Sequence, residues 1–322
     1  MQLSICTDVF GKMPFGEMLD KVKAYDLPAI ELTTGGWGGC FFVPSARELI
    51  DNSNKRKAFM AEIEARDLKI SALNCSGNPL APSAMGKAHS QTIHDTAELA
   101  GILGVKTIVT MSGLPAGCAH DMTPNWITST VSWPNFEGRN YMKEAVQYQW
   151  EQAWQWWEEY ASFAKEQGVE KIAIEAFPCQ LVYNVRSLKK LLSGLTMEAA
   201  SLVGMNLDPS HLIVQGADPI LAARALGEKI YYVHGKDARM ERGLADVDGL
   251  LENLPVEDVS KRTWNYVAVG CGQELQWWKE FFSVCHMMGY EGYVSLEMED
   301  LTMSKEAGLQ TSIASLRASI SQ

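Results

Sequence analysis

The sequence predicts a single closed (β/α)8 barrel, because eight short β-rich runs alternate with longer helical patterns along all 322 residues. Each run is almost continuously apolar, which is typical of parallel strands that are buried on both faces. No GxGxxG or Walker-type loop follows any run, so an open nucleotide-binding sheet is disfavoured. A barrel of about 250 residues with insertions fits this length. We therefore expect one domain, 1–322.

The expected elements follow in order along the chain. Strands are expected at 3–10, 29–34, 69–77, 106–113, 171–178, 204–210, 230–237 and 293–300. Helices are expected between them at 54–66, 88–103, 141–167, 217–227, 273–288 and 304–319. Asn54 is a suitable N-cap, and Gly104 and Gly168 stand where helices usually end. Within 88–103 the apolar residues recur every three or four positions, as in an amphipathic helix.

Two segments interrupt the regular alternation. The loop 112–140, after the fourth strand, is rich in Gly, Pro and Trp, and loops of this length usually serve as lids or interfaces. Trp126 and Trp133 within it are suited to form an apolar wall over a sugar or an aromatic ring. Trp150, Trp154 and Trp157 follow at helical spacing and are expected in the core or an interface. The second excursion, 239–264, precedes the last βα unit.

The overall composition excludes several classes of function. The formal net charge is −11 and no long basic run occurs, which argues against nucleic acid and anionic membranes as partners. No apolar stretch approaches the roughly 18 residues of a membrane span, and no secretion leader is evident. The seven cysteines are scattered and form no CxxC pair. We expect a cytoplasmic protein with reduced thiols.

Four consecutive strands each carry a potential metal ligand near their carboxyl ends. These residues are Glu175, Asp208, His234 and Glu297. In a closed barrel such strand ends meet on one face, where barrel active sites lie. Three carboxylates brought together without a cation would repel one another and shift each other's pKa values. The sequence therefore predicts a site for one divalent cation.

Each of these residues also has a simpler interpretation. Asp208 could simply cap the turn that begins at Pro209 and have no other role. Without the three acids beside it, His234 would be interpreted as a buried core histidine. Glu297 has acidic neighbours, of which Glu299 falls on the same side of the strand. Oxygen-rich sites with one imidazole favour Mn²⁺, Mg²⁺ or Co²⁺ over structural zinc. We expect one divalent ion, with Mn²⁺ first.

The chain resembles the xylose-isomerase-like TIM-barrel superfamily of sugar phosphate isomerases and epimerases over most of its length. The resemblance rests on "IAIEAFP", "NLDPSHL", "YVHGKDAR" and "YVSLEMED". It implies that the four ligands hold one Mn²⁺ or Co²⁺, and that Glu175 and Glu297 exchange the proton on the substrate carbon. By the same resemblance, His211 and Arg239 contact substrate hydroxyls or an oxyanion.

Further substrate contacts are expected around this face. Lys236 either stabilises developing negative charge or forms a salt bridge to Asp237, and we weigh these alternatives equally. Trp37, in the turn "TGGWGGC", is well placed to stack on a sugar, and Asn74 lies toward the carboxyl end of the third expected strand. Together with Trp126, these residues complete the expected substrate site. The expected partner is a small sugar or glycoside, with a homo-oligomer as the expected assembly.

A lyase is the main alternative within the same superfamily. The segments "NCSGNPL", "VTMSG" and "LVYN" resemble the large subunits of C-glycoside deglycosidases, which cleave 3-oxo-glycosides by β-elimination beside a small β-rich subunit. Their first step is also proton abstraction next to a carbonyl. Some relatives carry a histidine two residues after the fifth-strand glutamate, where this chain has Phe177.

Two further alternatives are weaker. Apurinic-site endonucleases share the barrel, and the pair Asp208 and His211 matches the spacing of one of their metal pairs. They need additional histidines on strands three, four and seven, where this chain has Asn74–Cys75, Thr110–Met111 and Lys236. A barrel that binds sugar without turnover is the last alternative.

Overall fold

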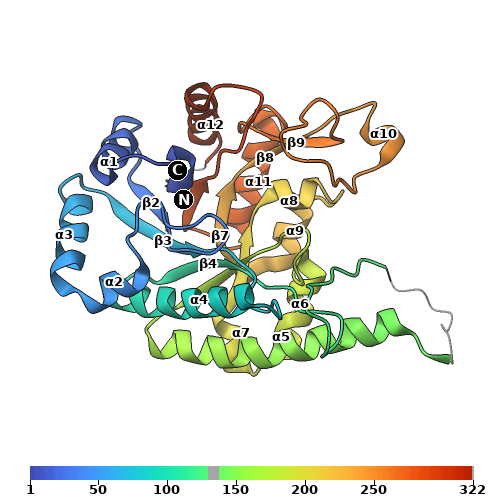
Figure 1. Cartoon of the computed structure of the whole chain (residues 1–322). Helices are drawn as coiled ribbons and strands as arrows, with labels where there is room; N and C mark the ends of the chain where they lie inside the picture. Colours follow the sequence, from blue (N-terminus) through green and yellow to red (C-terminus); the bar gives the residue numbers. More distant parts are fainter. Residues whose placement is uncertain (130–137, 321–322) are drawn as a thin grey trace.

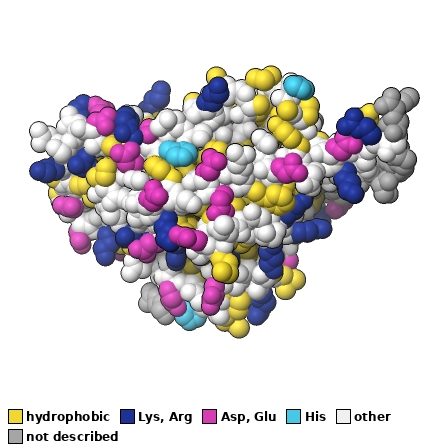
Figure 2. All heavy atoms as spheres, turned by 90° about the horizontal axis from the view of Figure 1, so that it is seen from below, with side chains coloured by type: hydrophobic (Ala, Val, Ile, Leu, Met, Phe, Trp, Pro, Cys, Tyr) yellow, Lys and Arg dark blue, Asp and Glu magenta, His cyan; other side chains and the backbone are white. Residues whose placement is uncertain are grey.

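The fold is described from a computed structural model for residues 1–129 and 138–320. Part of the expected loop 112–140, including Trp133, lies outside the described residues. In the part of the chain that the structure describes, no helix is long and apolar enough to cross a membrane. Figure 2 shows acidic and basic side chains interspersed over one face of the molecule.

Eight parallel strands close into a barrel, which confirms the predicted fold class (Figure 1). Around the ring the neighbours are β1, β2, β3, β4, β5, β6, β7 and β10, and β10 pairs with β1 to close it. The strands are β1 (Gln2–Cys6), β2 (Ala29–Thr33), β3 (Lys69–Cys75), β4 (Thr107–Met111), β5 (Lys171–Glu175), β6 (Val203–Leu207), β7 (Ile230–Gly235) and β10 (Tyr293–Leu296).

Helices surround this barrel. The six expected helices correspond to α3 (Ser53–Glu64), α4 (Ala84–Leu103), α5 (Tyr141–Glu166), α9 (Pro219–Leu226), α11 (Leu275–Met287) and α12 (Lys305–Ser319). The sequence analysis missed α1 (Phe15–Ala24), α2 (Ala46–Asp51), α6 (Val185–Ser193), α7 (Met197–Leu202), α8 (Pro209–Ile213) and α10 (Ala245–Asp248), and the short 3-10 helices η1 (Thr7–Phe10) and η3 (Gly227–Lys229). All of these have ten residues or fewer, too few to show a clear helical period.

The barrel interior below the carboxyl ends of the strands is filled by one large side chain among small ones. Tyr232 forms a buried cluster with Ala72, Val109 and Ala173. Its hydroxyl lies 2.7 Å from Ser71 Oγ, so its polar end is satisfied inside the barrel. Because side chains alternate along a strand, the residues two positions further along point into the barrel one layer above. Glu175 and His234 occupy that layer.

Helix α5 packs its tryptophans against the barrel, as expected. Trp150 and Trp157 are buried, and Trp154 packs partly buried against the same core. Trp157 Nε1 donates to the carbonyl of Ser112 at 3.0 Å, which ties α5 to the loop that follows β4. The other end of the helix projects beyond the barrel (Figure 1).

The second excursion is built on a two-stranded antiparallel ribbon. Strand β8 (Asp237–Met240) starts just after β7 and pairs with β9 (Trp264–Val267), with α10 between them. The fully buried carboxylate of Asp237 accepts backbone N–H bonds from Ala238, Gly270, Gly272 and Gln273 at 2.8–3.1 Å. One side chain therefore joins the start of the excursion to its end.

We expect Asp237→Ala to lower the free energy of unfolding by at least about 2 kcal/mol, because it leaves four backbone donors without their acceptor. Urea denaturation measures this change. The matched variant Asp248→Ala, at an exposed position of α10, should stay within about 0.5 kcal/mol of the parent. Equal stability of the two variants would contradict this role for Asp237.

Candidate metal centre

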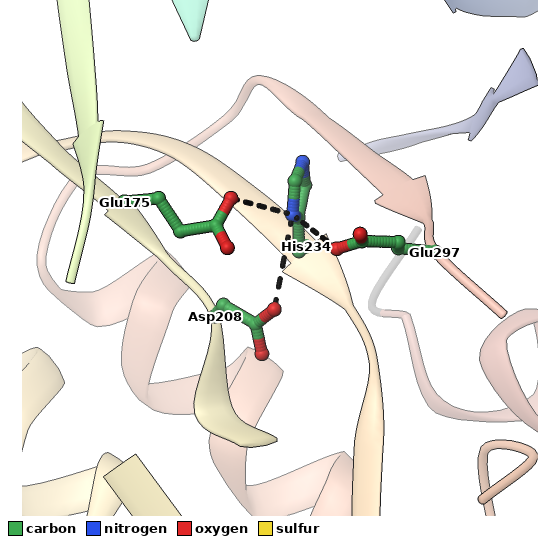
Figure 3. A group of neighbouring side chains, drawn as sticks. All are labelled: Glu175, Asp208, His234 and Glu297. Atoms are coloured by element: carbon green, nitrogen blue, oxygen red, sulfur yellow. Dashed lines mark ion pairs between the residues drawn. The ribbon is translucent and has the colours of Figure 1, made fainter. Parts of the chain in front are cut away.

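The four expected ligands come together at the carboxyl ends of four neighbouring strands. One ligand atom from each of Glu175, Asp208, His234 and Glu297 lies within 4.8 Å of the others. His234 Nδ1 is 3.1 Å from Glu297 Oε2, 3.6 Å from Glu175 Oε2 and 3.8 Å from Asp208 Oδ2. Figure 3 shows the three carboxylates directed toward the imidazole from separate strands.

Asp208 caps a helix with one oxygen and directs the other at the centre, so the two roles that the sequence left open, cap and ligand, are compatible. Its Oδ1 accepts bonds from the backbone N–H and the hydroxyl of Ser210, at 2.8 and 2.7 Å, and so caps α8. Pro209 is the first residue of that helix, a position where its missing N–H has no cost. The other oxygen, Oδ2, remains directed at the centre. Capping thus fixes the orientation of the carboxylate.

The polar atoms at the centre fit a bound cation. Asp208 Oδ2, His234 Nδ1 and Glu297 Oε2 are buried, and none of them makes a hydrogen bond to the described residues. Buried polar atoms without partners are costly and therefore rare in folded proteins. Three carboxylates with one imidazole are a donor set for a divalent ion such as Mn²⁺, Mg²⁺ or Co²⁺. These residues could therefore hold one divalent cation.

Glu31 orients the imidazole from the far side of the barrel. It is fully buried on β2, and its carboxylate oxygens lie 3.1 and 3.2 Å from His234 Nε2. Asn74 Nδ2 donates to Glu31 Oε1 at 2.7 Å and holds the carboxylate in place. A histidine whose outer nitrogen donates to a carboxylate presents its other nitrogen for metal binding. The sequence analysis missed Glu31, although an acid within the apolar run "AIELTT" was an available signal.

His211 is in contact with two of the three carboxylates. Its Nε2 is 2.7 Å from Glu175 Oε1 and 3.2 Å from Asp208 Oδ2. Its Nδ1 is 2.9 Å from the hydroxyl of Tyr266, which the sequence analysis also missed. His211 is fully buried and does not line the cavity described below. The structure therefore places His211 as a support for two of the expected ligands, and its expected contact with substrate stays a prediction.

Two basic residues differ in their relation to the centre. Lys236 Nζ lies 3.3 Å from Glu297 Oε1 and 2.8 Å from Glu299 Oε2, so its ion pairs are not with Asp237. Its ammonium also stands 4.5 Å from the centre of the Tyr266 ring. Arg239 instead pairs with Glu241 at 2.8 Å and does not line the cavity. The cavity lining does not include Arg239, and its expected contact with a sugar stays a prediction.

The charges at the centre shift the proton affinities of its members. Burial lowers the pKa of His234, but the nearby carboxylates of Glu31, Asp208 and Glu297 outweigh burial and hold it well above the ordinary value of 6.5. Burial raises the pKa of Glu297, yet Lys236 and His234 hold it well below its ordinary value. A proton on the imidazole thus compensates one of the negative charges, whereas a divalent cation would compensate two.

A cavity of about 780 Å³ opens over the centre and reaches Glu175 and Glu297. Of the expected substrate residues, Trp37, Asn74, Trp126 and Lys236 line it. The Asn74 amide is already engaged, since Nδ2 binds Glu31 and Oδ1 accepts the N–H and hydroxyl of Ser76. Trp37 is 50% exposed at the rim, where a ring could stack against it. The volume suits a small organic ligand.

Comparisons with known proteins agree with this architecture. A family model described as xylose isomerase-like TIM barrel matches residues 19–319. The uncharacterized protein YfiH of Bacillus subtilis (strain 168) is 53% identical over 323 residues, which cover 100% of both chains. The probable 3-DHS dehydratase AsbF from Bacillus anthracis superposes with a TM-score of 0.65 at 15% identity, over 98% of each chain. An L-ribulose 3-epimerase gives 0.60 at 16% identity, over 99% of this chain and 95% of the other.

We expect Glu31→Gln to weaken Mn²⁺ binding about 10–100-fold, because a neutral amide is a poorer acceptor for the imidazole N–H of a metal ligand. Calorimetric titration of metal-free protein measures the dissociation constant. Glu64→Gln, at an exposed position on α3, is the matched control and should bind as the parent does. Unchanged affinity in Glu31→Gln would remove Glu31 from the metal site.

Metal binding should also release protons. Because the pKa of His234 is held well above 6.5, its ring is protonated at neutral pH, whereas a metal needs the free Nδ1. The affinity for Mn²⁺ should therefore rise as the pH increases from 6.5 toward the raised pKa. Titrations at pH 7 in buffers with different ionisation enthalpies should show about one proton released per ion. Uptake of Mn²⁺ without proton release would contradict this assignment.

Proposed function

On the premise that the chain belongs to the xylose isomerase-like TIM barrel family, as the match over residues 19–319 establishes, we propose that it is a divalent-metal-dependent sugar isomerase or epimerase. In this proposal the enzyme removes a proton from the carbon next to a carbonyl. The observation that carries it is the pair of glutamates, Glu175 and Glu297, which approach one centre from β5 and β10. Two carboxylates on either side of a bound carbon can remove and return its proton.

In each glutamate one oxygen contacts His211 or Lys236 and the other lies nearer His234, and Glu175 Oε2 also accepts from Asn206 Nδ2 at 3.3 Å. Glu175 Oε1 accepts from His211 at 2.7 Å, and Glu297 Oε1 faces Lys236 at 3.3 Å. The remaining oxygens are therefore positioned toward a substrate that enters from the cavity. A divalent cation held by the four ligands, which we propose to be Mn²⁺, would polarise the carbonyl of a bound sugar and stabilise the charge that develops on it. Lys236 adds a second positive charge at the same edge of the site.

A lyase that acts on 3-oxo-glycosides is the second candidate. It shares the first proton abstraction and then expels the group on the next carbon. Met111, Leu114 and Phe177 on one wall of the cavity favour it, because a free ketose has no large apolar part to cover them. The lyase proposal includes a small β-rich partner subunit, whereas the isomerase proposal is compatible with a homo-oligomer. The name of the epimerase of similar fold supports the first candidate, and that of the dehydratase is compatible with a lyase.

The proposed function requires metal-dependent exchange of a substrate proton with solvent. Protein treated with EDTA and then incubated with candidate ketoses in D₂O should leave the sugars unlabelled. Addition of Mn²⁺ should restore deuterium incorporation at the carbon next to the carbonyl, detected by NMR. A released aglycone with 3-oxo-glycosides would assign the lyase instead. Exchange that is equally fast with and without metal would exclude both candidates.

We expect Glu175→Gln to slow this exchange by about 10²–10⁴-fold at saturating Mn²⁺, because an amide cannot carry the proton. The variant should still bind Mn²⁺ with reduced affinity, since the amide oxygen and three other ligands remain. Glu228→Gln, at an exposed position next to β7, should retain the parent rate. Near-normal exchange by Glu175→Gln would remove this residue from the proton transfer.

A further inference from the structure

Four buried polar atoms around the cavity lack hydrogen-bond partners among the described residues. Asp8 Oδ1, Thr33 Oγ1, Trp126 Nε1 and Gln180 Oε1 are buried and make no hydrogen bond to the described residues, and all four side chains line the cavity. They are separate from the metal ligands. Native proteins leave few buried polar atoms unpaired, so these atoms indicate where a ligand places its own donors and acceptors.

The four atoms form two groups on different sides of the barrel mouth. Asp8 lies just after β1 and Thr33 ends β2, and these strands are neighbours. Trp126 and Gln180 follow β4 and β5, another neighbouring pair three places further around the ring. Both of them also line an adjoining cavity of about 440 Å³, so they stand at the boundary between the two cavities. A ligand that satisfies both groups must extend across the mouth of the barrel.

The two sides differ in polarity. Near β1 to β3 the cavity wall includes the polar side chains of Asp8, Thr33 and Ser76 beside Trp37 and Met85. Near β4 and β5 the wall includes the apolar side chains of Met111, Leu114, Pro124, Trp126 and Phe177 beside Glu175, Cys179 and Gln180. A sugar is hydroxylated at nearly every carbon, and it suits the first wall better than the second. The second wall suits a flat apolar ring.

We infer that the ligand of this cavity is a glycoside whose apolar ring carries a hydroxyl group. The sugar lies against Asp8 and Thr33, and the ring lies on the β4 and β5 side. The ring hydroxyl accepts from Trp126 Nε1 and donates to Gln180 Oε1, which satisfies an unpaired donor and an unpaired acceptor with one group. A sugar phosphate fits less well, because Lys236 is the single basic residue among the described residues of the lining. That the sugar faces the metal centre rests on the second candidate of the proposed function, because a glycoside offers a carbonyl for proton abstraction only in an oxidised form such as a 3-oxo-glycoside.

Binding of a matched ligand series to the full-length protein tests this inference without requiring turnover. Isothermal titration calorimetry would compare methyl, phenyl and para-hydroxyphenyl β-glucoside, with D-fructose as the free sugar. We expect phenyl glucoside to bind at least about tenfold more tightly than methyl glucoside because of the buried ring. The hydroxyl should add about another tenfold. Affinities that are equal across the series would overturn the inference.

Two variants test whether Trp126 and Gln180 bind the ring hydroxyl. Trp126→Phe and Gln180→Leu should each remove most of the preference for para-hydroxyphenyl over phenyl glucoside, while methyl glucoside binds as before. Trp154→Phe is the matched control, because it makes the same change on α5, where Nε1 donates to Lys190 outside the cavity. A preference that survives both cavity variants would overturn the assignment of these two residues.

The test also separates this inference from the proposed function. If the ligand preference is present but Mn²⁺ restores no proton exchange on any sugar tested, the glycoside inference is supported and the proposed function is contradicted. If Mn²⁺-dependent exchange on a free ketose occurs and the ligand preference is absent, the glycoside inference falls alone.

Discussion

The fold around the centre is organised by one electrostatic constraint, which is that three carboxylates and an imidazole share a buried volume. Like charges at these distances repel strongly when water is excluded. The surrounding residues counter this repulsion in part, since Lys236 faces Glu297 and His211 faces Glu175 and Asp208. They do not remove it, because three ligand atoms still lack hydrogen-bond partners among the described residues. A divalent cation satisfies all of them at once.

The barrel provides the geometry that this constraint requires. Strand alternation places Glu175 above Ala173 and His234 above Tyr232, so the core layer below the centre holds the layer of ligands in position. The turn into α8 holds Asp208 by its capping oxygen. Glu31 reaches His234 across the barrel from β2. Each ligand is therefore fixed through an atom that the metal does not need, and this is how preorganised sites are built.

Much of this arrangement could be predicted from local sequence, and the remainder depends on distant contacts. Acidic residues and a histidine at the ends of apolar runs were sufficient to identify the four residues that converge, because strand ends meet in any closed barrel. Glu31 and Tyr266 were missed because their importance comes from contacts with His234 and His211, more than 50 positions away. The position of Arg239 on β8 was also not predicted, because the chain enters β8 directly after β7 and no local pattern showed that reversal.

The central claim is that one cation is held by side chains from β5, β6, β7 and β10. Anomalous diffraction at the manganese edge, from crystals grown with Mn²⁺, tests it most directly. We predict one strong peak within about 2.5 Å of an atom of each of Glu175, Asp208, His234 and Glu297. A peak bound elsewhere, or none between these four side chains at saturating Mn²⁺, would contradict the account.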